Sequence, residues 1–165
     1  MFATPLVAQT LTIDNVTIVD VVKGKLSPNM TVVVDGNRIT SIAKTRVGAP
    51  HASTVMDGTG MYVIPGLWDM HVDAFFSNDP SRFHTTTELM LPLFIANGVT
   101  GVRDMGSNLD AVLAARDSVA AHNQIGSRIL TSGPMLDGPT SRYQAIIKVA
   151  TAEDGRAAVR QLHDR

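Results

Sequence analysis

The stretch that most constrains the fold of this chain is residues 61–73, MYVIPGLWDMHVD. Val63 and Ile64 precede a Pro-Gly break, which ends one apolar element before a second apolar run begins at Leu67. The second run is too short for a helix and is bounded like a buried parallel strand. The sequence therefore predicts a junction here between two kinds of structure, with a new strand as the first element after it.

The strand predicted after the break ends in two potential metal ligands, His71 and Asp73. Residues two apart on a strand point to the same side, so we expect the imidazole and the carboxylate to project together. A hard or borderline divalent metal such as zinc accepts both donors. A bare His-x-Asp is more often an ordinary polar pair at a strand end.

The same segment resembles the signature of the amidohydrolase superfamily, in which (V/I)xPGLIDxHxH leads into the first strand of a metal-bearing (β/α) barrel. The shared residues are Pro65, Gly66, Leu67, Asp69 and His71. Asp73 replaces the second histidine of the signature, and the renal-type dipeptidases are similar in using His-x-Asp as a metal pair. The resemblance implies that His71 and Asp73 bind a divalent metal, with zinc as the first choice and one or two ions in complete members of the family.

The residues before the junction, 11–62, show the pattern of short β-strands. Apolar β-rich runs cover residues 11–22, and further strands are expected at 30–34 and 38–43. Between these two lies Asp35-Gly36-Asn37, where Asp-Gly favours the positive φ angles of a tight hairpin. We expect a small β-sandwich, either an independent domain or one similar to the split sandwich of the amidohydrolases, whose remaining strands come from the C-terminus.

Residues 63–165 change to strands that alternate with helices, which implies parallel β-α units. Apolar runs at 99–102 and 128–132 predict the second and third strands. Residues 74–84 are expected to form a loop, and a long loop rich in Gly and Pro is expected to begin at Gly133. The three strands account for three β-α units.

The helices of this half are predicted from apolar spacing and from their capping residues. The first helix is expected around Pro92, which implies a late start or a kink. Ser107 and Asp110 resemble a capping box for the second helix. Thr151 and Asp154 have the same pattern for the last helix.

Length sets a limit on the architecture. A complete (β/α) barrel takes about 250 residues, whereas this chain has 165. We therefore expect an α/β chain with a small N-terminal β-sandwich at 11–62 and the first three β-α units of a truncated (β/α)8 TIM-type barrel at 63–165. Residues 1–10 are expected to be a remnant of a secretory signal or a disordered tail.

The resemblance continues through the second half of the chain. The segments NGVTGVRDMGS and SRILTSGPML are similar to the second- and third-strand segments of the imidazolonepropionase-like and Xaa-Pro-dipeptidase-like amidohydrolases. In that group a carboxylated lysine, later histidine ligands and a catalytic aspartate follow. None of these has a counterpart here, so the catalytic residues are unknown.

Composition excludes several classes of partner. The 14 basic and 15 acidic residues give a net charge of -1, with no basic block for nucleic acid or an anionic membrane. There is no cysteine, which leaves His, Asp and Glu as metal ligands. No apolar run approaches the roughly 20 residues that span a bilayer. The location is expected to be periplasmic or secreted, or else cytoplasmic.

Arg103 and Asp104 follow the second predicted strand, on the barrel face where substrates bind. They hold a substrate carboxylate or a neighbouring loop, or else they form a structural ion pair, which is the commoner role of such a pair at a strand end. The remaining histidines are interpreted as surface residues or lack metal-like spacing; they are His51, His84, His122 and His163.

Two functional hypotheses follow. In the first, the chain is the N-terminal part of a metal-dependent amidohydrolase that cleaves amide or dipeptide C–N bonds through a metal-activated water. In the second, it is a non-catalytic pseudoenzyme or an oligomerising fragment. A homo-oligomer is expected in either case, because three parallel strands leave unpaired sheet edges.

Overall fold

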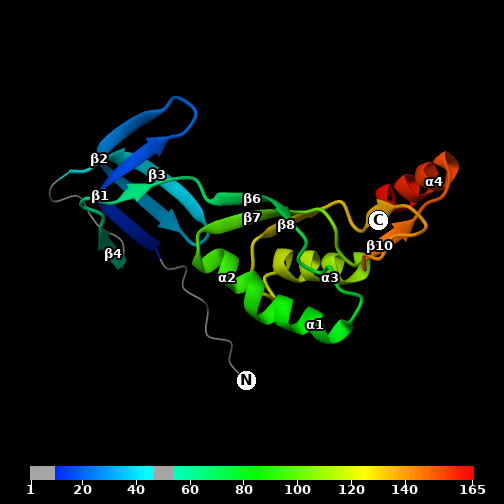
Figure 1. Cartoon of the computed structure of the whole chain (residues 1–165). Coiled ribbons are helices and arrows are strands. Elements are labelled where there is room, and N and C mark those ends of the chain that lie inside the picture. Colours follow the sequence, from blue (N-terminus) through cyan, green and yellow to red (C-terminus); the bar gives the residue numbers. More distant parts are fainter. Residues whose placement is uncertain (1–9, 47–53) are drawn as a thin grey trace, which may run out of the picture. The chain divides into compact units, whose positions relative to one another are not determined.

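The computed structural model describes residues 10–46 and 54–165. The chain divides into two compact units at Pro65/Gly66 (Figure 1). The predicted N-terminal tail lies outside the described residues, except for its last residue, and so does His51.

The first unit contains a single five-stranded sheet. Its strands are β1 (Thr10–Asp20), β2 (Lys25–Asp35), β3 (Arg38–Lys44), β4 (Thr54–Asp57) and β5 (Tyr62–Val63). β1, β2 and β3 are antiparallel neighbours, whereas β4 and β5 both pair with β1 in parallel. The sequence predicts a β-sandwich, which has two sheets, whereas the described residues of this unit form one sheet. The apolar pattern of a segment predicts a strand but not the number of sheets that the strands form.

The hairpin between β1 and β2 begins earlier than the sequence predicts. Val21 and Val22 were expected in a strand but lie in the turn. The Asp20 carboxylate accepts hydrogen bonds from the amides of Val22 (3.1 Å) and Lys23 (3.0 Å). A side-chain acceptor of this kind stabilises a turn locally, and here it outweighs the β propensity of the two valines.

Strand β1 is bent where the sequence is interrupted. Asn15 has a φ of 57°, and the β1–β2 register is irregular from Ile13 to Val16. The Gly58 amide donates to the Asp14 carbonyl at 2.7 Å. A Cβ at Gly58 would lie 2.9 Å from that carbonyl oxygen, so the connection between β4 and β5 needs a glycine there.

The second unit is a parallel α/β structure, which confirms the predicted α/β class. Its main sheet has the order β6-β7-β8, from β6 (Leu67–Val72), β7 (Val99–Asp104) and β8 (Arg128–Thr131). Its helical segments are α1 (Pro80–Thr85), the π-helical turn η1 (Thr86–Met90), α2 (Leu91–Ala96), α3 (Leu109–Ala120) and α4 (Ala152–His163). Helices α1 to α3 lie on one side of the sheet (Figure 1).

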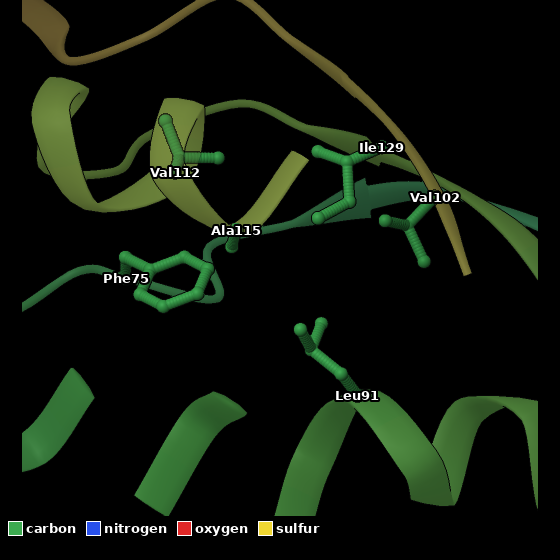
Figure 2. Close-up of a cluster of buried hydrophobic side chains, with 6 residues drawn as sticks. All are labelled: Phe75, Leu91, Val102, Val112, Ala115 and Ile129. Atoms are coloured by element: carbon green, nitrogen blue, oxygen red, sulfur yellow. The ribbon is translucent and has the colours of Figure 1, made fainter. Parts of the chain in front are cut away.

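The core of this unit lies between the sheet and those helices. Figure 2 shows Leu91 of α2 pointing towards Val102 of β7 and Ile129 of β8. The cluster is completed by Phe75, from the loop after β6, and by Val112 and Ala115 of α3. Leu91 and Val112 are fully buried, so the helices are attached to the sheet by apolar packing.

The first helical segment begins earlier than predicted. The expected loop ends at Asp79, which is the N-cap of α1 and accepts a hydrogen bond from the Ser81 amide at 3.0 Å. Pro80 occupies the first turn, where its missing N–H has no cost. Pro92 lies in the first turn of α2, directly after the π-helical turn, so the helical path continues past it.

The capping predictions have different outcomes. The N-cap of α3 is Asn108, whose side chain accepts from the Ala111 amide at 3.1 Å, so the predicted box at Ser107 is wrong. The predicted box of α4 is confirmed: Thr151 and Asp154 exchange both hydrogen bonds. The loop expected from Gly133 contains two short parallel strands that were not predicted, β9 (Met135–Asp137) and β10 (Ile146–Lys148).

The sheet face opposite the helices carries Trp68, which is 41% exposed. The indole lies on Gly101 of the neighbouring strand so closely that a Cβ there would overlap its ring. None of the helices among the described residues is long and apolar enough to cross a bilayer.

Candidate metal and substrate site

A β-bulge lies at the C-terminal end of β6, next to the predicted metal ligands. In the β6–β7 pairing, Asp69 is opposite Val102 and Val72 is opposite Asp104, so β6 has one residue more than β7 between these pairs. The bulge therefore contains Met70 and His71. Bulges of this kind redirect side chains near functional sites.

The carbonyl of Met70 at this bulge is satisfied by a side chain. Nε of Arg103 donates to Met70 O at 2.8 Å. In addition, Oδ1 of Asp69 accepts a hydrogen bond from the His71 amide at 3.0 Å. Two residues singled out in the sequence, Asp69 and Arg103, thus hold the backbone at Met70 and His71.

His71 and Asp73 are both exposed at this strand end. His71 lies in the bulge, and Asp73 is the first residue after β6. Since the extra residue interrupts strict alternation, the simple two-residue rule does not by itself determine where the two side chains point. Asp73 Oδ1 lies close to Gly106, where a Cβ would be 2.9 Å away.

Asp104 is fully buried and connects the three strand ends. Its Oδ2 accepts hydrogen bonds from the Ala74 amide (3.0 Å) and from Ser107 Oγ (2.6 Å). Its Oδ1 accepts from Thr131 Oγ1 at the end of β8 (3.3 Å). Ser107 Oγ in turn accepts from the Phe75 amide at 2.8 Å, so the loop after Asp73 is held at two successive residues.

Burial raises the pKa of the Asp104 carboxyl above its usual 3.8, and this effect exceeds the opposing effect of the donated hydrogen bonds. The strongest opposing hydrogen bond comes from Ser107, followed by those from Ala74 and Thr131. The negative charge of Asp73 contributes a further rise in the pKa. Asp73 and Asp104 therefore interact electrostatically across the loop.

The predicted substrate pair points in two directions. Asp104 faces the buried network, whereas Arg103 is exposed on the opposite side of β7. No ion pair joins them among the described residues. The two terminal nitrogens of Arg103 make no hydrogen bond to the described residues.

The donor set is suitable for a divalent metal but small. An imidazole and a carboxylate are typical zinc ligands, whereas a catalytic zinc usually has three protein ligands. Within residues 10–46 and 54–165, no group of three or more His, Cys, Asp or Glu side chains is placed to hold a metal. His71 and Asp73 can therefore supply part of a site, and the part that they supply is open to solvent.

Sequence reasoning missed Ser107 as a member of this network, because its spacing to Asp110 suggested a helix cap. It also missed Tyr143 and Gln144, which the structure brings next to the loop after β6. The short Met105-Gly106-Ser107 segment after the second strand was a signal for a close approach at Gly106. Residues from the long second loop had no local signal, since their contacts span 66 or 67 positions.

Comparisons with known proteins agree on one family. The model of the Amidohydrolase family matches residues 62–164. Among solved structures, a Bifidobacterium longum protein assigned as a prolidase is 30% identical, with a TM-score of 0.81, over 96% of this chain and 39% of that one. Phenylurea hydrolase B is 29% identical, with a TM-score of 0.67, over 94% of this chain and 36% of that one.

A Xaa-Pro dipeptidase with methionine bound in its active site has a TM-score of 0.75 at 21% identity, over 94% of this chain and 44% of that one, which shows a likeness of fold. The chain thus spans less than half the length of each of these three structures. No curated protein matches the sequence significantly.

Proposed function

Because the chain belongs to the amidohydrolase family, we propose that it is the N-terminal part of a metal-dependent hydrolase that cleaves a C–N bond of a small amide or dipeptide. In this proposal β6, β7 and β8 are the first three strands of a (β/α)8 barrel. The observation that carries it is the combination of the family signature with His71 and Asp73 exposed at the C-terminal end of a parallel strand. Active sites of such barrels lie at that end.

His71 and Asp73 would hold a divalent metal, with zinc as the first choice. When bound, such a metal lowers the pKa of a water molecule towards neutrality and polarises a carbonyl group. Arg103 would orient the substrate through its terminal nitrogens, while its Nε maintains the bulge at Met70. Asp104 would act indirectly, since its hydrogen bonds hold the loop that follows Asp73.

Metal binding is the direct test of this proposal. Titration of zinc into the chain, followed by calorimetry, should give binding that is lost in His71→Ala/Asp73→Ala. The control is His163→Ala/Asp164→Ala, which removes an exposed His–Asp pair with a 3.3 Å contact at the end of α4. Equal zinc affinity in all three proteins would refute the assignment.

A non-catalytic role is the second candidate, and one observation favours it. The described residues supply two metal ligands rather than the three of a typical catalytic zinc. We expect the 165-residue chain to show little turnover of a dipeptide panel, even with added metal. Turnover of roughly 1 per second or faster, as in typical enzymes, would show that these residues already form a complete active site.

We also propose that the chain self-associates through the second unit. Among the described strands, β8 pairs only with β7, and an apolar hollow of about 740 Å³ lies beside it. Its walls include Ile95 of α2, Val119 of α3 and Ile129 of β8. Light scattering coupled to size-exclusion chromatography should show a dimer or larger species; a monomer of 17.6 kDa at micromolar concentration would contradict this.

A further inference from the structure

Two loops that are distant in the sequence are joined by hydrogen bonds beside Asp73. Gln144 Oε1, in the loop between β9 and β10, accepts hydrogen bonds from Ser77 Oγ (3.1 Å) and from the Asn78 amide (3.0 Å). In return, Asn78 Oδ1 accepts from the Ala145 amide at 3.2 Å. The loop after β6 and the loop after β9 therefore hold each other.

One residue of these hydrogen-bonded loops has an unfavourable backbone conformation. Ala145 has a φ of 46° and is buried. A non-glycine residue with a positive φ is strained and persists only where its surroundings enforce it. The hydrogen bond from its amide to Asn78 is one such constraint. The geometry of this loop pair is thus strongly specified, as is common at ligand-binding sites.

The two hydrogen-bonded loops border an open hollow that reaches Asp73. Its volume is about 480 Å³, and its lining residues are Asp73, Phe76, Met135 and Tyr143. The rings of Phe76 and Tyr143 meet edge to face, with centroids 6.1 Å apart and an interplanar angle of 72°. The lining combines two aromatic rings and a thioether with two polar groups, the Asp73 carboxylate and the Tyr143 hydroxyl.

Gly106 lets the two sides of the hollow approach each other. A Cβ at this position would lie 2.9 Å from Asp73 Oδ1 and 3.0 Å from Met135 Cγ. The proposed metal ligand and the apolar wall are therefore separated by little more than a glycine. Small-molecule sites have this composition, with a mostly apolar lining and a few polar groups that fix orientation.

We propose that this hollow is a specificity pocket for an apolar or aromatic group of the substrate, next to the bond that is cleaved. The proposal rests on the proposed hydrolase function and adds the substrate class: amides or dipeptides with a large apolar side chain are preferred over glycine-like ones. Phe76, Met135 and Tyr143 contact that group. Gln144 is a positioning residue, because it holds the loop that carries Tyr143.

The test uses two neutral probes, N-acetyl-L-phenylalaninamide and N-acetylglycinamide, each titrated into the 15N-labelled chain with and without zinc. We expect the wild type to bind the phenylalanine probe about tenfold more tightly, from burial of one aromatic side chain. Amide shifts should centre on Gly106, Met135 and Tyr143. Equal affinity for the two probes, or shifts centred elsewhere, would overturn the proposal.

Tyr143→Ala should reduce the preference to about threefold or less, because one wall of the pocket is removed. Tyr143→Phe, which keeps the ring, should retain the preference. Tyr62→Ala is the matched control, since Tyr62 lies in the first unit and is equally exposed, at 63%. Gln144→Ala should weaken the preference as well, and an unchanged preference in both Tyr143→Ala and Gln144→Ala would refute the pocket.

The two metal conditions separate this proposal from the proposed function. Probe discrimination without any zinc binding would support the pocket and refute the metal site. Zinc binding without probe discrimination would support the metal site and refute the pocket.

Discussion

The two units of the chain differ in the size of their apolar cores and in the direction of their strands. In the first unit, the described apolar residues that are fully buried are Val16 and Val32, and the order of the sheet follows from hairpins and a parallel return to β1. In the second unit, Phe75, Leu91 and Val112 belong to one contiguous core beneath a parallel sheet.

The direction of the strands determines where functional side chains can gather. Antiparallel neighbours such as β1, β2 and β3 run in opposite directions, so their carboxyl ends lie alternately at two opposite edges of the sheet. Parallel strands need helices and a core, and their carboxyl ends meet at one edge. In this chain that edge carries the bulge at His71, the buried Asp104 and the hollow beside Asp73.

The largest expected effect would break the core of the second unit. Leu91→Ala removes a fully buried side chain and should destabilise this unit by about 3 kcal/mol. Trp68 is the only tryptophan of the chain and lies in this unit, so urea unfolding followed by tryptophan fluorescence reports on it. Val32→Ala, in the first unit, is the control, and an equal shift of the Trp68 transition would show that the units unfold together.

The next effect concerns the polar network of the second unit, in which Asp104 and Ser107 are more deeply buried than the polar residues described in the first unit. Ser107→Ala leaves the Phe75 amide without its acceptor and removes the 2.6 Å hydrogen bond to Asp104, so we expect a loss of about 2 kcal/mol. Ser132→Ala, at an exposed position after β8, should be nearly neutral. Similar losses for both variants in urea unfolding would mean that the network contributes little.

A smaller effect is expected in the first unit. Gly58→Ala places a methyl group 2.9 Å from Asp14 O and from Val16 Cβ, so the strand must shift, at a cost of about 1.5 kcal/mol. Amide hydrogen exchange of β1 measures this. Gly155→Ala, within α4, has open space around the new methyl group and should stabilise its helix by about 0.5–1 kcal/mol. A loss in that control would contradict the steric explanation.

The smallest expected effect is a difference between the two units in how their stability depends on pH. The pKa of Asp104 is raised in the folded state, so its contribution to stability is fully present below 3.8 and is lost as the pH rises through the folded pKa. The pKa of Asp57 in the first unit is lowered, chiefly by its hydrogen bond from Asn15, so its contribution is present above 3.8 and is lost as the pH falls through the folded pKa.

Just above pH 3.8, the second unit should therefore gain stability on acidification while the first unit does not. Below 3.8 both units should weaken, since the pKa values of Asp79, Asp137 and Asp154 are also lowered. Amide exchange of β1 and β7 in pH steps measures the two responses. The gain in the second unit should be absent in Asp104→Asn, and its persistence there would assign it to another group.

Much of the fold could be predicted from local patterns. The Asp35-Gly36-Asn37 turn, the Pro-Gly break and the capping box of Thr151 each depend on neighbouring residues, and the structure places β2–β3, β6 and α4 accordingly. The two three-residue strands β9 and β10 could not be predicted, because a run of that length has no measurable period. Ser107 has a capping pattern but is used in tertiary contacts instead.

The candidate site was predicted only in part for the same reason. His71 and Asp73 are recognised from a contiguous motif. The bond from Arg103 to Met70 depends on a bulge, which arises from the pairing of two strands, and the hollow depends on a loop more than 60 residues away. Such features depend on strand register and tertiary packing, so they cannot be predicted from a local sequence pattern.

The π-helical turn η1 makes chain length at this point a structural variable. A π-helical turn closes with a hydrogen bond one residue longer than that of an α-helix, so it uses about one residue more for the same rotation. Deletion of one residue in η1 would therefore convert it into an α-helical turn while α1 keeps nearly the same orientation relative to Leu91. Insertion of a residue would instead rotate α1 by about 100°, which would separate Phe83 from Phe75, whose rings meet at 5.9 Å. Loss of one residue in η1 should therefore be tolerated more readily than the gain of one.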